Sequence, residues 1–567
     1  MPKFISKIFK KNKKDFSFEE ILQEATLQKY GTQENKLYLR INSFGIYFLF
    51  FTFFSISLWF LYNAYILQIK DFAIYDEKSK NNQLTFTPIF PIRGNIIDRN
   101  NVILAKSEKV GTSSEEYERW YIEKEGFGHI LGYTTPPQKD SKGKFWQENF
   151  KGIAGIEEYY DLLLRGVPGK EYFEINAKGV KEKSFITEKP VQGKDIILSI
   201  DEGMQEKAYQ TLKTYVNKNG YLGGSALMMN IENGEILFLT NYPEYSSYKI
   251  NSTATNSNEY VQELQKSENN PFLNRAISGL YAPGSIVKPV FGLAALQTET
   301  ISPNTYIFSP GFFIYTNSKT GKKTTYKDWK AHGSTNIVEA IAVSSDVFFY
   351  TISGGSDLIK GMGIKTIDLF TKAFKMDQKI GIDLFGEKAG NVPTPEWKMK
   401  TFNEEWYDGD TIISSIGQFG FLMTPLEALT MTALIANEGE IYTPHLVKKE
   451  EKQDENFKTK VNIDIKNEWY KMVKNGMHQV VANDIGTAKT LNMPFTKMAA
   501  KTGTAEFGKN KEYIHSWVVG FFPYDKPKYA FVFMMEKSKA NKPDPATLVA
   551  RDFFWWMWEN KKEYFTE

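Results

Sequence analysis

A stretch of 29 residues without a charged side chain, positions 41–69, constrains this chain more than any other feature. It reads INSFGIYFLFFTFFSISLWFLYNAYILQI. About 20 apolar residues are enough to cross the hydrocarbon core of a bilayer as a helix. We therefore expect a transmembrane helix from Gly45 to about Leu67, with Trp59, Tyr62 and Tyr65 near one membrane interface.

The charges beside this segment predict its orientation. Residues 1–40 hold nine Lys and Arg against five Asp and Glu, which favours a cytoplasmic N-terminus with the rest of the chain outside. A cleaved signal peptide is the alternative, but its apolar part usually spans only about 7–15 residues and ends in a small-x-small site. This segment lacks such a site, and no later segment is long and apolar enough to span. We expect a retained, single-pass anchor.

The balance of residue types narrows the chemistry. The chain has 70 Lys and Arg against 67 Asp and Glu, and only seven of the basic residues are Arg. Proteins that bind nucleic acids usually carry a basic face and favour Arg over Lys, so we expect no nucleic-acid partner. There is no Cys, and the five His show no metal-ligand spacing. We expect neither a metal nor a cofactor, and chemistry carried by Ser, Thr, Lys and carboxylates.

The segment after the anchor, residues 70–193, is polar, rich in Gly and Lys and interrupted by many turns, which predicts a small β-rich module. Two pieces stand out, 91–105 and 152–166. Neither holds a plausible nucleophile and base. We interpret their Arg and carboxylate side chains as buried ion pairs that fix turns.

From about residue 194 the pattern indicates strands separated by helices. We expect a strand at 196–201, a hairpin at 225–240, strands at 516–522 and 529–535, and a final helix near 550–559. An antiparallel sheet built from both ends of a domain, with helices inserted between them, is an α+β fold. The expected parts are a tail (1–40), an anchor (41–69), a short β-rich pedestal (70–193) and a main domain (194–567).

Three short motifs of the main domain carry possible chemistry. In the first, Pro-Gly precedes Ser285 and an apolar run, which predicts a turn into a helix with Ser285 in its first turn. Lys288 would lie on the same helical face, where an unprotonated amine could take the proton of the hydroxyl. Taken alone, the spacing of Ser285 and Lys288 is weak evidence for catalysis, and an exposed Ser beside a solvated Lys is the simpler interpretation.

The second motif is Ser344-Ser345-Asp346 before an apolar run, which on its own is equally typical of a helix cap. The third is Lys501-Thr502-Gly503-Thr504, close to the strand at 516–522, where a glycine allows a substrate backbone to approach. A second Lys-Thr-Gly at 319–321 lies in a polar turn between two strand-like runs, and we interpret that copy as a hairpin. We therefore select the copy at 501.

The order of the three motifs resembles the penicilloyl serine transferases. Flanking sequences resemble the class B penicillin-binding proteins, and among these the elongation type, penicillin-binding protein 2, more than the septal type. The class B resemblance is carried by Arg93-Gly94, Asp98-Arg99, Leu104-Ala105, Gly152–Glu157, Leu164–Gly166, Asn274–Ala276, Ile416–Gln418 and Thr424-Pro425. The resemblance to the elongation type is carried by Asp346, Lys501–Ala505 and Asn391–Trp397. The resemblance covers the anchor and about residues 90–567. It implies a transferase-like α+β domain on a dimerisation-like pedestal.

The resemblance implies a role for each residue. Ser285 would attack the penultimate D-alanyl carbonyl of a peptidoglycan stem peptide and release D-Ala. Lys288 would be the base, with its pKa kept low by a second cation, Lys501. Ser344 would pass the proton to the leaving amine, and the amine of a neighbouring stem would then resolve the acyl-enzyme.

Substrate binding is implied for the third motif. The amides of Ser285 and Thr504 would form an oxyanion hole, and Thr502, Thr504 and Lys501 would hold the terminal carboxylate beside Gly503.

Three departures from the family pattern stand out. Asp346 replaces the commoner amide and should stabilise a charged Lys288, unless Lys501 takes up that pairing. Phe419-Gly420-Phe421 replaces a glycine-rich stretch. Only about 20 residues separate Ala105 from Gly126, where larger members carry a head subdomain.

The expected function is a β-lactam-sensitive D,D-transpeptidase of the bacterial cytoplasmic membrane. Its expected partner is a membrane glycosyltransferase of the shape, elongation, division and sporulation family. A septal transpeptidase, a β-lactamase-like hydrolase or carboxypeptidase, and a non-catalytic β-lactam sensor or wall-synthesis scaffold are the alternatives.

Overall fold

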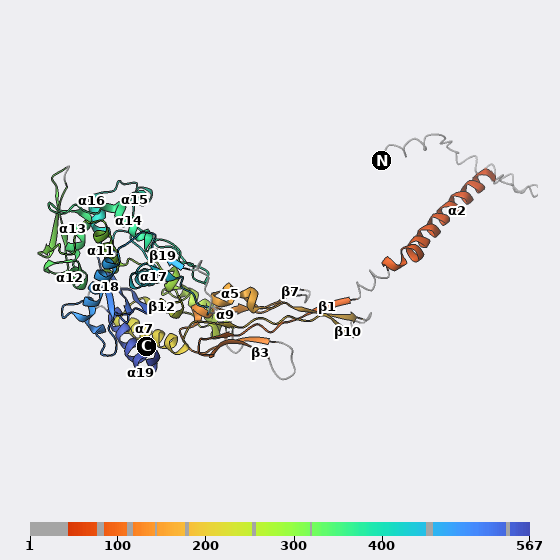
Figure 1. Ribbon diagram of the computed structural model, residues 1–567. Coiled ribbons are helices and arrows are strands. Elements are labelled where there is room, and N and C mark those ends of the chain that lie inside the picture. The colour runs from red at the N-terminus through yellow and green to blue at the C-terminus, as the bar shows by residue number, and fades with distance from the viewer. Residues whose placement is uncertain are drawn as a thin grey trace, which may run out of the picture. The chain divides into compact units, whose positions relative to one another are not determined.

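The computed structural model describes residues 43–75, 84–109, 117–141, 145–175, 181–251, 257–317, 320–448, 458–539 and 545–566 (Figure 1). The predicted tail, residues 1–40, lies outside the described residues. The chain divides into two compact units. One comprises residues 1–85 with 174–182, and the other comprises residues 86–173 with 183–567.

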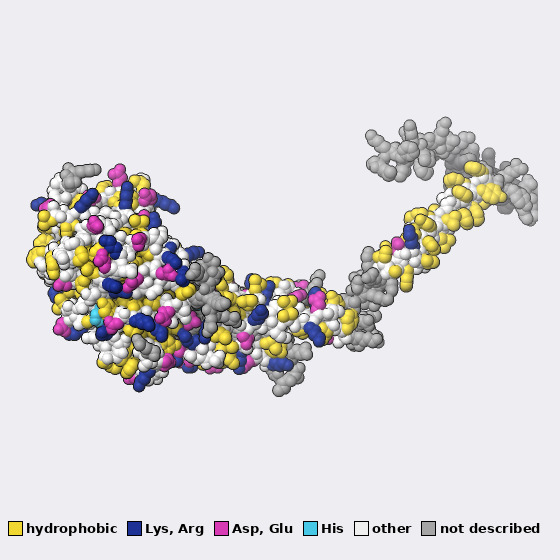
Figure 2. Space-filling model, viewed as in Figure 1, with side chains coloured by type: hydrophobic (Ala, Val, Ile, Leu, Met, Phe, Trp, Pro, Cys, Tyr) yellow, Lys and Arg dark blue, Asp and Glu magenta, His cyan; other side chains and the backbone are white. Residues whose placement is uncertain are grey.

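The predicted anchor is a helix. Helix α2 spans Ser43–Tyr65 and continues as a π-helical turn, η1, over Ile66–Lys70. Figure 2 shows hydrophobic side chains along the length of this helix. Residues Phe44–Lys70 are long and apolar enough to cross a membrane.

The pedestal segment is rich in short strands, as predicted. A four-stranded sheet has the order β11-β2-β3-β4, and a three-stranded sheet has the order β1-β9-β10. Their bounds are β1 Leu84–Ile89, β2 Ile96–Ile97, β3 Ile103–Lys109, β4 Tyr117–Tyr121, β9 Gly169–Ile175, β10 Lys181–Glu188 and β11 Ile196–Ile197. Shorter elements in the same segment are α4 Gly128–Leu131, β5 Thr134–Thr135, β6 Gln138–Lys139, β7 Phe145–Gln147, β8 Lys151–Gly152, α5 Gly155–Tyr159 and α6 Asp161–Leu164.

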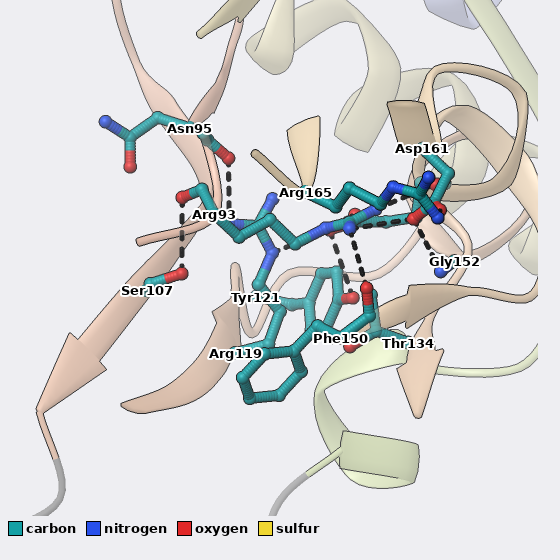
Figure 3. A network of polar contacts seen from close by, with 12 residues as sticks. Arg93, Asn95, Ser107, Arg119, Tyr121, Thr134, Phe150, Gly152, Asp161 and Arg165 are labelled. Carbon is teal, nitrogen blue, oxygen red and sulfur yellow. Dashed lines mark hydrogen bonds and ion pairs between the residues drawn. The ribbon is translucent and has the colours of Figure 1, made fainter. Parts of the chain in front are cut away.

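A buried cluster of charges fixes the turns of the pedestal (Figure 3). Glu157 on α5 accepts hydrogen bonds of 2.6 Å from both Arg93 and Arg119, and Arg93 also pairs with Asp161 at 2.8 Å. Burial alone would raise the pKa of Glu157, but the two guanidinium groups hold it below its ordinary value. The interpretation of these side chains as structural ion pairs is confirmed.

The main domain has the predicted antiparallel sheet, with one strand different. The strand expected at 196–201 is only β11, Ile196–Ile197, and pairs with β2 of the pedestal, whereas the edge strand β20 was not predicted. The sheet has five antiparallel strands in the order β13-β12-β22-β21-β20, so strands from both ends of the domain pair in one sheet. The strands are β12 Gly223–Asn230, β13 Ile236–Tyr242, β20 Ala499–Phe507, β21 Tyr513–Phe522 and β22 Tyr529–Lys539. Nearly every residue of β12, β13 and β21 is buried, which indicates that both faces of the sheet are covered.

Helices from both ends and from the insert cover this sheet. Helices α7 and α19 pack on each other and on the sheet, and α17 and α18 pack on β22 and β20 respectively. The helices are α7 Glu202–Asn219, α8 Ser247–Asn251, α9 Ser257–Lys266, α10 Arg275–Ser278, α11 Lys288–Gln297, α12 Ile337–Ala342, α13 Asp346–Gly354, α14 Gly363–Ala373, α15 Pro395–Phe402, α16 Asp408–Ser414, α17 Pro425–Ala436, α18 Asn467–Ala482 and α19 Ala546–Asn560. The predicted α+β class is correct.

The Lys-Thr-Gly copy at 319–321 lies between two paired strands, β15 Phe312–Thr316 and β16 Lys323–Lys327. Lys319 itself lies outside the described residues. Gly321 has φ +65° and an open surrounding, as a hairpin turn requires. The remaining strands of the insert are β14 Ile307–Ser309, β17 Gly333–Thr335, β18 Glu440–Tyr442 and β19 Lys458–Lys460.

Candidate active site

The predicted nucleophile, Ser285, lies in a tight turn at the start of a buried helix. The turn is a 3₁₀ helix, η2, over Gly284–Val287, and α11 begins directly after it at Lys288. Ser285 therefore precedes the α-helix, whereas the sequence predicted it in the first turn. Gly284 has φ +57°, and a Cβ there would lie 3.0 Å from the carbonyl oxygen of Thr504. The serine turn thus packs directly on strand β20.

Gly503 makes this close packing possible. A Cβ at Gly503 would lie 2.6 Å from the Pro283 carbonyl oxygen and 2.8 Å from Cγ2 of Ile286. The sequence suggested that this glycine admits a substrate backbone, but the backbone beside it here is that of the serine turn. The fully buried Trp517 also holds this turn, because its Nε1 donates to the Ala282 carbonyl at 3.0 Å.

The second motif, Ser344-Ser345-Asp346, both caps a helix and contacts the two lysines. Ser345 caps α13, since its hydroxyl accepts from the Phe348 amide at 3.4 Å. Ser344, by contrast, is buried with φ +57°, a conformation that is costly for a residue with a side chain. Asp346 is the first residue of α13. The cap interpretation is therefore correct for Ser345, while its two neighbours face the lysines.

Two buried lysines converge on Ser344. Lys288 donates to the Ser344 carbonyl at 2.8 Å and lies 3.3 Å from its hydroxyl. Lys501 donates to the same hydroxyl at 2.8 Å and to the Thr502 carbonyl at 3.0 Å. The Ser344 hydroxyl thus lies between two amines that come from different elements, α11 and β20.

Asp346 pairs with Lys288 and not with Lys501. The Nζ of Lys288 lies 2.5 Å from Oδ1 of Asp346. Lys501 does not take up this pairing, because its Nζ donates to the Ser344 hydroxyl instead. Burial raises the pKa of Asp346, and the nearby Asp328 adds to that effect, although the Lys288 ammonium opposes it.

The remaining predicted residues lie around this centre. Thr504 is exposed on β20, the edge strand of the sheet. Thr502 is buried, and its hydroxyl shares a hydrogen bond of 2.7 Å with Thr487. Among the described residues, none forms a hydrogen bond with the Ser285 hydroxyl, which leaves it available to a ligand.

Sequence reasoning missed Asp328 and Trp329. The Asp328 carboxylate is buried and accepts from the Ser345 hydroxyl at 3.1 Å and from the Val347 amide at 3.0 Å. Burial alone would raise its pKa, but the neighbouring His332 and backbone amides lower it to about 2. Trp329 donates to the Ser344 carbonyl at 3.4 Å. The only signal was an Asp-Trp pair after a hairpin strand, which has no distinctive spacing.

The phenylalanines that replace a glycine-rich stretch have a packing role. Phe419 has φ +61°, and its ring contacts those of Trp397 and Trp406 at 6.1 and 5.8 Å between centroids. Gly420 packs against the ring of Trp397. Within the described parts of the chain, no group of three or more His, Asp or Glu could hold a metal ion.

Comparisons with known proteins agree with this geometry. Residues 224–554 match the family model for the penicillin binding protein transpeptidase domain, and residues 112–198 match that for the penicillin-binding protein dimerisation domain. The peptidoglycan D,D-transpeptidase MrdA of Haemophilus influenzae is 27% identical, with 86% of this chain and 88% of the relative aligned. MrdA of Acinetobacter baumannii is 31% identical, with 78% of this chain and 66% of the relative aligned.

Solved structures of penicillin-binding proteins are also similar to this chain. Penicillin-binding protein 2 of Pseudomonas aeruginosa, in complex with WCK 5153, is 30% identical with a TM-score of 0.70, over 85% of this chain and 100% of that one. Penicillin-binding protein 2 of Helicobacter pylori, in complex with MreC, is 27% identical with a TM-score of 0.68, over 84% and 100%. Because the transpeptidase model matches more than half of the chain and these relatives match most of it, the chain belongs to the class B penicillin-binding proteins, elongation type.

Proposed function

We propose that this protein is a peptidoglycan D,D-transpeptidase that crosslinks stem peptides during cell-wall elongation through an acyl-enzyme on Ser285. One observation carries the proposal: Lys288 and Lys501 meet at the Ser344 hydroxyl, and the elements that bear them both contact the Ser285 turn. The relatives named D,D-transpeptidase support the reaction.

The proposed acylation is a transfer of one acyl group. The Ser285 oxygen attacks the penultimate D-alanyl carbonyl, the C–N bond to the terminal D-Ala breaks, and Ser344 relays a proton to the leaving amine. Lys288 takes the serine proton. The amine of a neighbouring stem peptide then attacks the ester, forms the crosslink and releases Ser285.

Lys288 can act as a base only after its ammonium has given up a proton. Asp346 is the carboxylate in contact with it, at 2.5 Å, and burial raises the pKa of Asp346. Relief of this ion pair is therefore part of the proposed acylation, because a carboxylate in contact with an amine favours its charged form. Lys501, as a second cation on the other side of Ser344, opposes a second positive charge at Lys288.

The third motif would bind the substrate. The amides of Ser285 and Thr504 would stabilise the oxyanion, a contribution usually worth several kcal/mol. Lys501, with the hydroxyls of Thr502 and Thr504, would hold the terminal carboxylate. Gly503 would keep the strand close enough to the serine turn for both tasks.

The proposed topology has residues 1–40 in the cytoplasm, a single anchor at 41–69, a pedestal at 70–193 and the catalytic domain at 194–567 outside the membrane. The positive charge of the tail supports this orientation. A membrane glycosyltransferase of the shape, elongation, division and sporulation family is the proposed partner, through the anchor and pedestal. β-Lactams would act as substrate analogues.

Intact-mass measurement of the full chain in detergent after treatment with benzylpenicillin tests the nucleophile. We expect one stable adduct in the parent and none in Ser285→Ala. Consumption of the antibiotic without an adduct would indicate a hydrolase. A stem-peptide donor and an amine acceptor must then give a crosslinked product, because a sensor or scaffold would form the adduct without crosslinking.

A septal role is the second candidate, since the D,D-transpeptidase FtsI of Buchnera aphidicola is 29% identical over 69% of this chain. Depletion in the native host separates the two roles. An elongation enzyme is needed for growth of the side wall, whereas a septal enzyme is needed only for division.

A further inference from the structure

A cavity of about 240 Å³ lies in the larger unit, and none of the proposed catalytic or substrate-binding residues lines it. Its walls come from the pedestal, where Tyr133 and Glu158 lie, and from the segments after β13, where Tyr245 and Phe272 lie. Strand β13 is one edge of the five-stranded sheet, and β20, which carries Lys501, is the other. A ligand in this cavity would therefore not compete with the substrate.

Five of the thirteen lining residues carry aromatic rings. Tyr245 contacts Tyr133 at 5.7 Å, Phe272 at 5.3 Å and His129 at 5.1 Å between ring centroids. Phe385 lines the cavity from another segment and is well exposed. Faces of such rings carry partial negative charge, which attracts a cation.

The carboxylate of Glu158 adds a full charge to this wall. Among the described residues this carboxylate has no hydrogen bond or ion pair, and partial burial raises its pKa while the charge of Lys151 opposes that shift. Glu158 lines the same cavity as Tyr133 and Tyr245. Burial raises the pKa of both phenols, and the negative charge of Glu158 adds to that effect. The other carboxylate nearby, Glu244, is already used, since it accepts from the Gly128 amide at 3.2 Å.

The position of Glu158 is fixed by its neighbour. Glu157 accepts hydrogen bonds of 2.6 Å from both Arg93 and Arg119, which anchors helix α5 within the pedestal. A carboxylate without a partner, on an anchored element and beside aromatic faces, is a preformed receptor for a cation.

We propose that this cavity binds a primary alkylammonium group, with the ammonium paired to Glu158 and the alkyl chain packed against Tyr133, Tyr245 and Phe272. The volume of about 240 Å³ is below that of a drug-sized pocket and suits a single aminoalkyl chain. An anionic ligand would be repelled by Glu158. A purely apolar ligand would leave that carboxylate desolvated without a partner, at a cost.

Calorimetric titration of the full chain in detergent tests the proposal with three probes. Cadaverine represents a free amine, N-acetyl-lysine methylamide represents an amine borne on a peptide, and 1-pentanol is the neutral control. We expect saturable binding of at least one amine and none of pentanol. Glu158→Gln should weaken amine binding by about tenfold or more, whereas Glu123→Gln, an exposed pedestal glutamate outside the cavity, should leave it unchanged.

The two amines identify the source of the ligand. Binding of the lysine derivative alone would assign a side chain on a peptide, and binding of cadaverine alone would assign a soluble amine. No saturable binding of either, equal binding of pentanol, or equal affinity in Glu158→Gln would overturn the proposal. Penicillin acylation of Glu158→Gln should equal that of the parent, which shows that the variant is folded and keeps this test separate from the proposed function.

Discussion

The amine of Lys288 and the carboxylate of Asp346 are 2.5 Å apart, with the lysine side chain fully buried and the aspartate 16% exposed. A carboxylate at this distance favours the charged form of the amine. The proposed base is therefore held in an ion pair, and relief of this pairing becomes part of the proposed acylation.

Asp346→Asn removes that attraction while it keeps the size of the side chain. The ammonium is then less favoured, so the neutral amine forms at lower pH. We expect the pH at which benzylpenicillin acylation reaches half of its maximum to fall by about one to two units. Stopped-flow acylation rates between pH 5 and 10 measure this midpoint.

Asp357→Asn, an exposed change, is the control and should leave the midpoint in place. An unchanged midpoint in Asp346→Asn would mean that this ion pair does not govern the base.

The two Lys-Thr-Gly copies differ sharply in their surroundings. Lys501 is fully buried and donates to Ser344, whereas Gly321 of the other copy lies in the turn between β15 and β16. Lys501→Ala should slow acylation by about 100-fold or more, because a preorganised charge at the reacting centre is lost. Lys319→Ala should change the rate by less than about twofold.

Second-order acylation constants for both variants, with thermal unfolding as a check on folding, decide between the copies. Comparable losses in the two variants would mean that the hairpin also contributes to the site.

Much of this arrangement could be predicted from the sequence. Alternating and continuous apolar runs predicted four of the five strands of the sheet, β12, β13, β21 and β22. The three motifs selected Lys288, Ser344 and Lys501, whose side chains meet. The spacing of motifs could not say which lysine pairs with Asp346, because that depends on how α11 and β20 pack. Asp328 was missed for a similar reason: it lies 18 residues before Asp346, and only folding brings it to the start of α13.

Asp328 should stabilise the protein in a pH-dependent way. Its pKa in the folded state is about 2, below the ordinary value of 3.8, so its charged form is favoured by folding. The stabilisation is complete above the unfolded pKa and is lost as pH falls toward the folded pKa. We expect Asp328→Asn to lower the unfolding free energy by about 2 kcal/mol at pH 7.

Melting temperatures of the parent and Asp328→Asn at pH 7, 5, 4 and 3 test this. The difference should be constant down to about pH 5 and shrink at pH 4 and below. A difference that does not depend on pH would show that hydrogen-bond geometry, and not charge, is what Asp328 supplies.

Gly503 is the point where strand β20 and the serine turn approach most closely. A Cβ there would lie 2.6 Å from the Pro283 carbonyl oxygen, which belongs to the backbone and cannot rotate away.

Gly503→Ala must therefore push the Ser285 turn away from the strand that carries Lys501 and Thr504. A displacement of about 1 Å at a reacting group can cost about 100-fold in rate. We expect acylation by benzylpenicillin to slow by about that factor, with a lowered melting temperature. Gly203→Ala is the matched control, because the nearest atom to its added Cβ is 3.5 Å away. That change lies in helix α7, so it should leave the acylation rate unchanged and should not lower the melting temperature. If Gly503→Ala acylates at the parental rate and melts at the parental temperature, then the turn and the strand need no close contact, and the proposed oxyanion hole, which spans both, loses its structural basis.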